Sequence, residues 1–110
     1  MVFGVDFDGT LCSDAYPNIG KPNLSLIKRL LAYQTNGTKL ILWTCRANQF
    51  LNEAISWCSL YGLHFDAINE NLPEIVAKYG SDSRKITADL YIDDRMISPW
   101  DDDAFLKEAI

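Results

Sequence analysis

The sequence predicts an α/β protein with a small parallel sheet of about four strands and helices on both faces. Short apolar runs alternate along the chain with segments whose apolar residues recur at helical spacing. This alternation is typical of parallel sheets, because parallel strands need long crossover connections, which are usually helices. With 110 residues, of which 48% are hydrophobic, the chain is expected to form a single domain over residues 1–110.

The first half of the chain is predicted to contain two strands and one helix. Residues 2–6 form a short buried strand, and the turn-forming residues of 12–23 make a loop. The next segment is predicted to be helical up to Asn36-Gly37, because its apolar residues recur every three or four positions. The apolar run at 39–44 is the second predicted strand.

The second half is predicted to continue the alternation and to end in a helix. The expected elements are a helix capped by Asn48 and ended by Gly62, a strand over 64–69, a helix capped by Asn71 and ended by Gly80, a polar connector over 81–85, a strand over 88–92 and a helix from residue 98 to the C-terminus. All these elements together predict a Rossmann-like three-layer sandwich.

Charge and composition exclude several classes of function. The formal net charge is −5, which argues against a broad nucleic-acid binding face. No apolar run approaches the roughly 20 residues of a membrane span, and no signal-peptide pattern is present. The three cysteines, Cys12, Cys45 and Cys58, do not form a disulfide framework or a zinc motif, so reduced thiols and a cytoplasmic location are expected.

Two acids follow the first predicted strand. Asp6 and Asp8 are two residues apart and precede Gly9 and Thr10. Two close carboxylates repel each other, and a cation or shifted pKa values are needed to keep both ionised. We therefore expect a hard metal such as Mg²⁺ here, and chemistry on an anionic substrate.

Further reactive side chains occur where other predicted strands begin or end. Parallel strands bring their carboxyl ends to one edge of a sheet, where ligands bind in open α/β folds. The candidates beyond the first strand are Thr44, Cys45 and Arg46 after the second strand, Lys85 before the fourth, and Asp93 and Asp94 after it.

This ordered set resembles the four motifs of the haloacid dehalogenase (HAD) superfamily of phosphotransferases. The first motif is matched by Asp6-Phe7-Asp8-Gly9-Thr10, the second by Thr44 and the fourth by Asp93-Asp94. Lys85 matches the third motif, although spacing alone leaves Arg84 and Lys78 open as alternatives. The match spans roughly residues 1 to 95.

The resemblance implies a role for each acid. Asp6 would be the nucleophile, forming an aspartyl phosphate, and would also bind Mg²⁺. Asp8 would be the general acid and then the general base, with its backbone carbonyl on the metal. Asp94 would be a direct metal ligand, and Asp93 a water-mediated ligand or a partner of the motif lysine.

The remaining candidates would surround the phosphoryl group. Thr44 would donate a hydrogen bond to a phosphoryl oxygen, and Lys85 would offset negative charge. Arg46 would contact substrate phosphate or form a surface salt bridge. The other predicted substrate-side residues are Cys45, Gly9, which allows a sharp turn, and Thr10, which can fix the acids from within that turn.

The short chain leaves no room for a cap domain, so the resemblance implies a minimal, capless HAD-like hydrolase. We expect a Mg²⁺-dependent phosphomonoester hydrolase whose specificity depends on the loops at 12–22, 46–50 and 69–73. Its substrate could be a small phosphorylated metabolite, a nucleotide or a phosphorylated polymer end, and an oligomer is possible. Two alternatives remain, a receiver-like regulatory domain and a degenerate module that binds Mg²⁺ or phosphate without catalysis.

Overall fold

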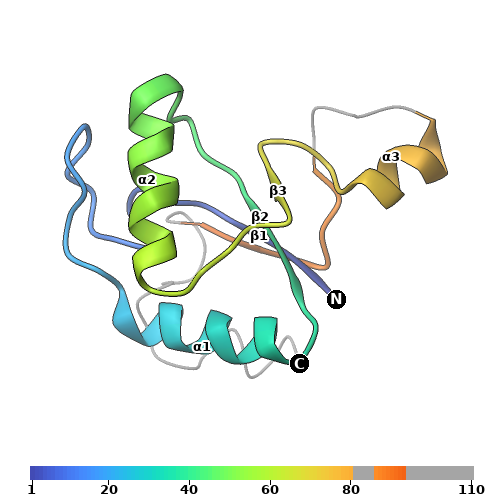
Figure 1. The fold of residues 1–110 in the computed structure, drawn as a ribbon, viewed down its shortest axis with the longest axis horizontal. Helices are drawn as coiled ribbons and strands as arrows, with labels where there is room; N and C mark the ends of the chain where they lie inside the picture. Colours follow the sequence, from blue (N-terminus) through green and yellow to red (C-terminus); the bar gives the residue numbers. More distant parts are fainter. Residues whose placement is uncertain (81–85, 94–110) are drawn as a thin grey trace.

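The computed structural model of the chain describes residues 1–80 and 86–93. Over these residues it has one four-stranded sheet, all parallel, with strand order β3-β2-β1-β4 (Figure 1). The elements in chain order are β1 (Val2–Val5), α1 (Leu24–Thr35), β2 (Lys39–Leu42), α2 (Asn48–Leu60), β3 (Ala67–Ile68), α3 (Pro73–Tyr79) and β4 (Leu90–Ile92). The predicted α/β fold class is confirmed.

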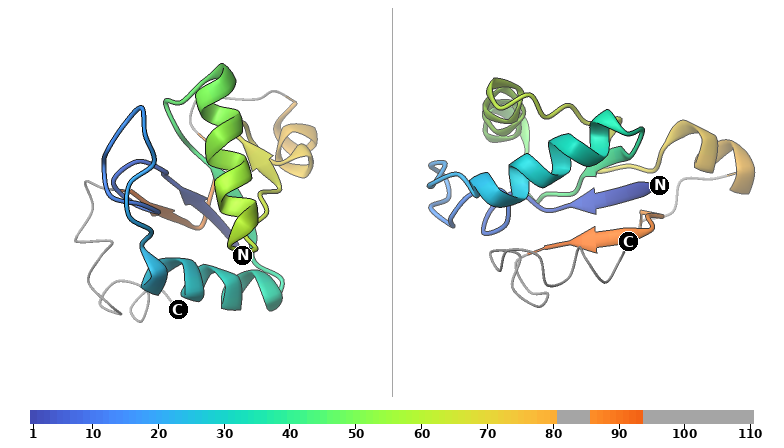
Figure 2. Two further views of the ribbon diagram at one scale, coloured as in Figure 1. Left: turned by 60° about the vertical axis from the view of Figure 1, so that its left-hand side comes forward. Right: turned by 90° about the horizontal axis from the view of Figure 1, so that it is seen from below.

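Most of the hydrophobic core lies between one face of the sheet and the helices α1 and α2. Phe3 and Val5 of β1 pair with Leu40 and Leu42 of β2, and all four side chains are fully buried. The same core cluster includes side chains of α1 and α2. The right-hand view of Figure 2 shows α1 and α2 on one side of β1, whereas β4 lies on the other side of β1. Burying each large apolar side chain contributes about 1.5–3 kcal/mol, so this face anchors the fold.

A smaller cluster lies on the opposite face of the sheet. Side chains alternate between the faces along a strand, so Ile41 points away from its neighbours Leu40 and Leu42. Ile41 packs with Ala67 and Ile86, and Ile75 of α3 packs against this cluster. Figure 1 shows α3 apart from α2, on the other side of the strands.

The third strand is shorter than predicted. The expected strand over 64–69 is a strand only at Ala67–Ile68. The reason lies in Asp66, whose side-chain Oδ2 accepts the backbone N–H of Leu40 at 2.9 Å. A carboxylate thus replaces the backbone carbonyl that a longer ladder would supply at this point.

Two predicted helix caps are wrong. The N-cap of α2 is Ala47, and Asn48 is already inside the helix, with a positive φ of 52°. The N-cap of α3 is Leu72, because the side chain of Asn71 instead accepts the backbone N–H of Thr87. That long-range hydrogen bond connects the start of α3 to the segment before β4. The predicted connector at 81–85 and the predicted C-terminal helix lie outside the described residues.

No helix in the described part of the chain is both long enough and apolar enough to span a membrane.

Candidate functional site

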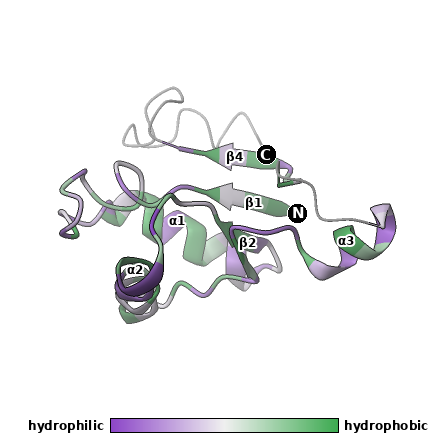
Figure 3. Ribbon diagram, turned by 90° about the horizontal axis from the view of Figure 1, so that it is seen from above, coloured by the Kyte–Doolittle hydropathy of each residue, from purple (hydrophilic) through white to green (hydrophobic). Residues whose placement is uncertain are grey.

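Three adjacent strands carry the candidate site residues to the same edge of the sheet. Val5 is in register with Leu42 on one side and with Ile92 on the other, so the residues that follow these three positions are neighbours. The backbone N–H of Asp6 donates to the carbonyl of Ile92 at 2.9 Å, which continues the β1–β4 pairing by one residue. Figure 3 shows β1 and β4 pointing the same way, as this pairing requires.

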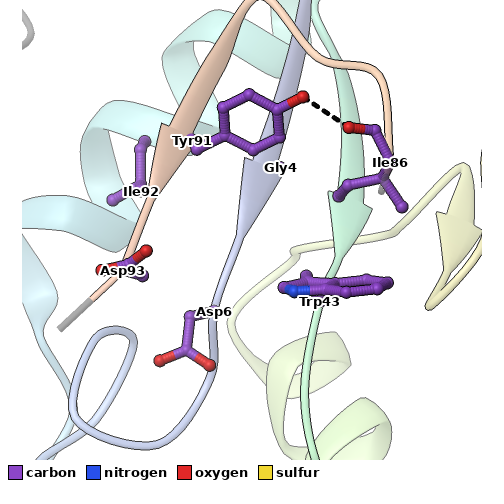
Figure 4. Close-up of a pocket in the computed structure, with 7 residues that line it drawn as sticks. All are labelled: Gly4, Asp6, Trp43, Ile86, Tyr91, Ile92 and Asp93. Carbon is purple, nitrogen blue, oxygen red and sulfur yellow. Dashed lines mark hydrogen bonds between the residues drawn. The ribbon is translucent and has the colours of Figure 1, made fainter. Parts of the chain in front are cut away.

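Asp6 and Asp93 are brought together by this register. Both carboxylates lie at the carboxyl ends of adjacent strands and line one pocket of about 180 Å³ (Figure 4). The rest of the lining is apolar or aromatic, with Trp43 beside Asp6, Tyr91 further along the sheet, and Gly4, Ile86 and Ile92. Tyr91 is held by its hydroxyl, which donates to the carbonyl of Ile86. The pocket therefore combines two acids with an apolar wall.

The turn after β1 is built from the predicted first motif. The backbone N–H groups of Thr10 and Leu11 both donate to the carbonyl of Phe7, at 3.1 and 3.0 Å. Gly9 has a φ of 83°, a left-handed conformation that favours glycine. Thr10 is fully buried, and its hydroxyl donates to Oδ2 of Asp6 at 3.2 Å. Thr10 therefore orients the nucleophile candidate and has no surface with which to contact substrate.

Asp8 is held by a two-pronged ion pair with Arg46. The Nε of Arg46 donates to Oδ2 of Asp8 at 2.8 Å, and its Nη2 donates to Oδ1 at 2.7 Å. The Arg46 side chain has 0% exposed surface, whereas the Asp8 side chain is 20% exposed. The hydrogen bond to Asp8 raises the pKa of Arg46 above its already high ordinary value. The sequence left open a surface salt bridge for Arg46; the structure shows a salt bridge in which the arginine is buried and the aspartate is partly exposed.

The remaining donors of Arg46 bind backbone carbonyls. Its Nη2 also donates to Asn18 at 3.0 Å, and its Nη1 donates to Pro17 at 3.2 Å and to Phe50 at 3.4 Å. A guanidinium has five N–H donors, and these contacts with the two to Asp8 use all of them. Arg46 therefore does not offer a donor to substrate phosphate in this structure, contrary to the other interpretation of the sequence.

Two aromatic rings enclose the same guanidinium. Its carbon lies 5.0 Å from the ring centroid of Phe7 and 5.0 Å from that of Tyr16. Tyr16 in turn contacts Phe50 edge-on, with ring centroids 5.7 Å apart. These contacts connect the loop at 12–23 with the start of α2.

Thr44 is fixed at the end of β2 through Asn69. The backbone N–H of Thr44 donates to the side-chain oxygen of Asn69 at 2.7 Å, and the hydroxyl of Thr44 accepts the backbone N–H of Arg46 at 3.1 Å. The hydroxyl hydrogen stays available to an acceptor such as a phosphoryl oxygen. Asn69 has a φ of 55°, a conformation that asparagine tolerates. The sequence had indicated a specificity loop over 69–73 but not this hydrogen bond between Asn69 and Thr44. Cys45 is exposed beside Thr44.

Two predicted site residues, Lys85 and Asp94, lie outside the described residues, as does the alternative Arg84. Lys78, the other alternative for the motif lysine, is in α3 and places its Nζ 5.4 Å from the ring centroid of Tyr79. Figure 3 shows α3 toward the end of the sheet where β1 begins. This position argues against Lys78 as a partner of Asp6.

Residues 1–80 and 86–93 contain no group of three or more His, Cys, Asp or Glu side chains arranged to hold a metal ion. They do supply the Asp6 and Asp93 carboxylates at one pocket. Mg²⁺ prefers oxygen ligands and is usually bound through one or two protein carboxylates together with water and substrate oxygens. The two acids are therefore compatible with such a site.

The fold and the site define an α/β protein with two acids at the carboxyl edge of a parallel sheet. No protein-family model matches the chain, and no curated protein matches it either. A solved structure, described as a conserved protein from Bacteroides thetaiotaomicron, is 42% identical with a TM-score of 0.79. The match covers 91% of this chain and 83% of that protein, so the chain belongs to the same family.

Proposed function

We propose that the protein is a Mg²⁺-dependent phosphomonoester hydrolase of the HAD type. The observation that supports this proposal best is the convergence of Asp6, Asp93 and Thr44 on one edge of the sheet. They follow three adjacent strands, and two of them line the same pocket. This arrangement agrees with the order of the sequence motifs and leaves the site open to substrates of different sizes.

In the proposed reaction, Asp6 attacks the phosphorus atom of the ester. A bond forms between an Asp6 oxygen and phosphorus, and the bond between phosphorus and the leaving oxygen breaks. The hydrogen bond from Thr10 to Oδ2 of Asp6 orients the carboxylate. Water then attacks the phosphorus of the acyl phosphate, which releases inorganic phosphate and restores Asp6.

Asp8 handles protons in both steps of this scheme. It gives a proton to the leaving oxygen in the first step and takes one from the attacking water in the second. Thr44 donates a hydrogen bond to a phosphoryl oxygen, which positions the group and stabilises its charge. Lys85 is proposed to offset the charge of Asp6 and the phosphate.

The protein groups that would hold Mg²⁺ are the carboxylates of Asp6, Asp93 and Asp94 and the backbone carbonyl of Asp8. When bound, the ion supplies positive charge that offsets the negative charge of the phosphoryl group. The substrate class stays open among small phosphorylated metabolites, nucleotides and phosphorylated polymer ends.

The test is hydrolysis of para-nitrophenyl phosphate by the wild type and by Asp6→Asn, each with Mg²⁺ and with EDTA. We expect turnover by the wild type with Mg²⁺ alone. Lys39→Gln is the control, because Lys39 forms an exposed ion pair with Glu74 on another part of the surface. Activity that survives both Asp6→Asn and EDTA would refute the proposal. A wild type that hydrolyses no phosphoester, yet melts at a higher temperature with Mg²⁺, would favour the non-catalytic module instead.

A further inference from the structure

We infer that Arg46 is the positioning residue of Asp8, holding that carboxylate in place for proton transfer. The inference rests on the proposed function and deepens it. Its basis is the geometry of the ion pair, in which each oxygen of Asp8 accepts one hydrogen bond from a different nitrogen of Arg46. A fork of this kind fixes both the position and the plane of a carboxylate.

The guanidinium can fix Asp8 because it is itself immobilised. Three backbone carbonyls, those of Pro17, Asn18 and Phe50, accept its other N–H groups. These carbonyls come from two separate segments, the loop at 12–23 and α2, so movement of either one alone does not release the side chain. A buried cation is costly unless it is paired, and the Asp8 carboxylate provides that pairing.

The fork leaves part of the Asp8 carboxylate accessible to a reacting group. A carboxylate has about four lone-pair sites on its two oxygens, and the fork uses one on each oxygen. Asp8 also keeps 20% of its side-chain surface exposed, whereas Arg46 keeps none. Solvent and substrate can therefore reach Asp8 but not Arg46. Arg46 affects the reaction only by holding Asp8 in place.

A group that moves protons must lie within hydrogen-bond reach of the reacting oxygen, and small displacements reduce the rate strongly. Loss of the fork is therefore expected to lower kcat more than it raises KM. Loss of the fork should reduce the rate most for substrates whose leaving oxygen needs a proton most. Para-nitrophenolate is a weak base that leaves without much help, whereas the alkoxide of an alkyl phosphate requires protonation.

The experiment compares kcat/KM for para-nitrophenyl phosphate and for glycerol phosphate in the wild type, Arg46→Lys and Arg46→Gln. We expect Arg46→Gln to reduce the rate on glycerol phosphate about tenfold more than the rate on para-nitrophenyl phosphate. Arg46→Lys keeps the positive charge but cannot form the two-pronged ion pair. Its rate on glycerol phosphate should therefore lie between those of the wild type and Arg46→Gln. Lys39→Gln removes an exposed cation and should change neither rate. Equal losses on both substrates in the arginine variants would overturn the inference.

A second measurement separates this inference from the proposed function. Unfolding temperatures are measured for Arg46→Gln, Asp8→Asn and the double variant, with Arg46→Lys replacing Arg46→Gln if the latter does not fold. We expect the double variant to lose less than the sum of the single losses, because each single change leaves one partner without its counterpart. Additive losses would overturn the inference even if the wild type is an active phosphatase. Total inactivity of the wild type on both phosphoesters would overturn the proposed function and with it the proton-transfer role of Asp8, whereas additive losses in an active wild type overturn the inference alone.

Discussion

Phe7 separates the two acids of the first motif and anchors them to the core, so it offers a direct test of how the site is built. Its ring is fully buried and lies edge-on to Trp57, with centroids 5.6 Å apart and an interplanar angle of 90°. The guanidinium of Arg46 lies 5.0 Å from the same ring. Replacement by leucine keeps an apolar side chain there and removes both ring interactions.

The expected cost of Phe7→Leu follows from these two contacts. An edge-on aromatic pair contributes about 0.5–1.5 kcal/mol beyond its buried area, and a cation–π contact contributes about 0.5–2 kcal/mol. We therefore expect the free energy of unfolding to fall by about 1–3.5 kcal/mol. For a domain of this size, this loss lowers the melting temperature by roughly 4–14 °C.

Thermal unfolding followed by circular dichroism measures this shift. Tyr79→Leu is the matched control, because it replaces an aromatic ring that is 63% exposed in α3. The control is expected to change stability by less than about 0.5 kcal/mol. A Phe7→Leu protein that melts within about 1 °C of the wild type would refute the assigned role of the ring. An equal loss in the control would refute it as well.

Two further predictions concern the loop at 12–23 and the three thiols. A Cβ added at Gly20 would lie 2.2 Å from a backbone carbonyl oxygen of the same loop, so Gly20→Ala should lower the free energy of unfolding by about 1–3 kcal/mol, measured by urea denaturation. Stability equal to that of the wild type would contradict the described loop geometry. Ellman's reagent should modify Cys45 first, since the other two thiols are buried. Burial raises the pKa of Cys58 to about 12, so that thiol should react only on unfolding, and its rapid reaction in the native protein would contradict this packing.

The fold could be predicted from the sequence because its signals are local. Apolar runs and helical periodicity identified the strands and the helices α1 and α2, start and stop residues identified α3, and the parallel pairing followed from the alternation of strands and helices. Two of the errors, the length of β3 and the cap of α3, arose where a polar side chain pairs with a distant residue. Asp66 accepts the N–H of Leu40, and Asn71 accepts that of Thr87, over 26 and 16 residues of sequence. Local patterns contain no information about such partners.

The candidate site was predicted only in part for the same reason. The motif order identified Asp6, Asp93 and Thr44, whose neighbourhood follows from strand register alone. Strand register does not predict that Arg46 pairs with Asp8. The ion pair joins residues 38 positions apart and depends on the fold of the loop at 12–23. Nor does a sequence show that an arginine is buried.

The Arg46–Asp8 pair changes the electrostatic argument for a metal. The sequence indicated that Asp6 and Asp8 repel each other and need a cation or shifted pKa values. In the structure, Arg46 offsets the charge of Asp8 with two hydrogen bonds, so this repulsion is already compensated within the protein. The carboxylates that share one pocket are instead those of Asp6 and Asp93, on adjacent strands. A cation that stabilises this site is therefore expected between β1 and β4, and Asp93→Asn should weaken its binding more than Asp8→Asn does.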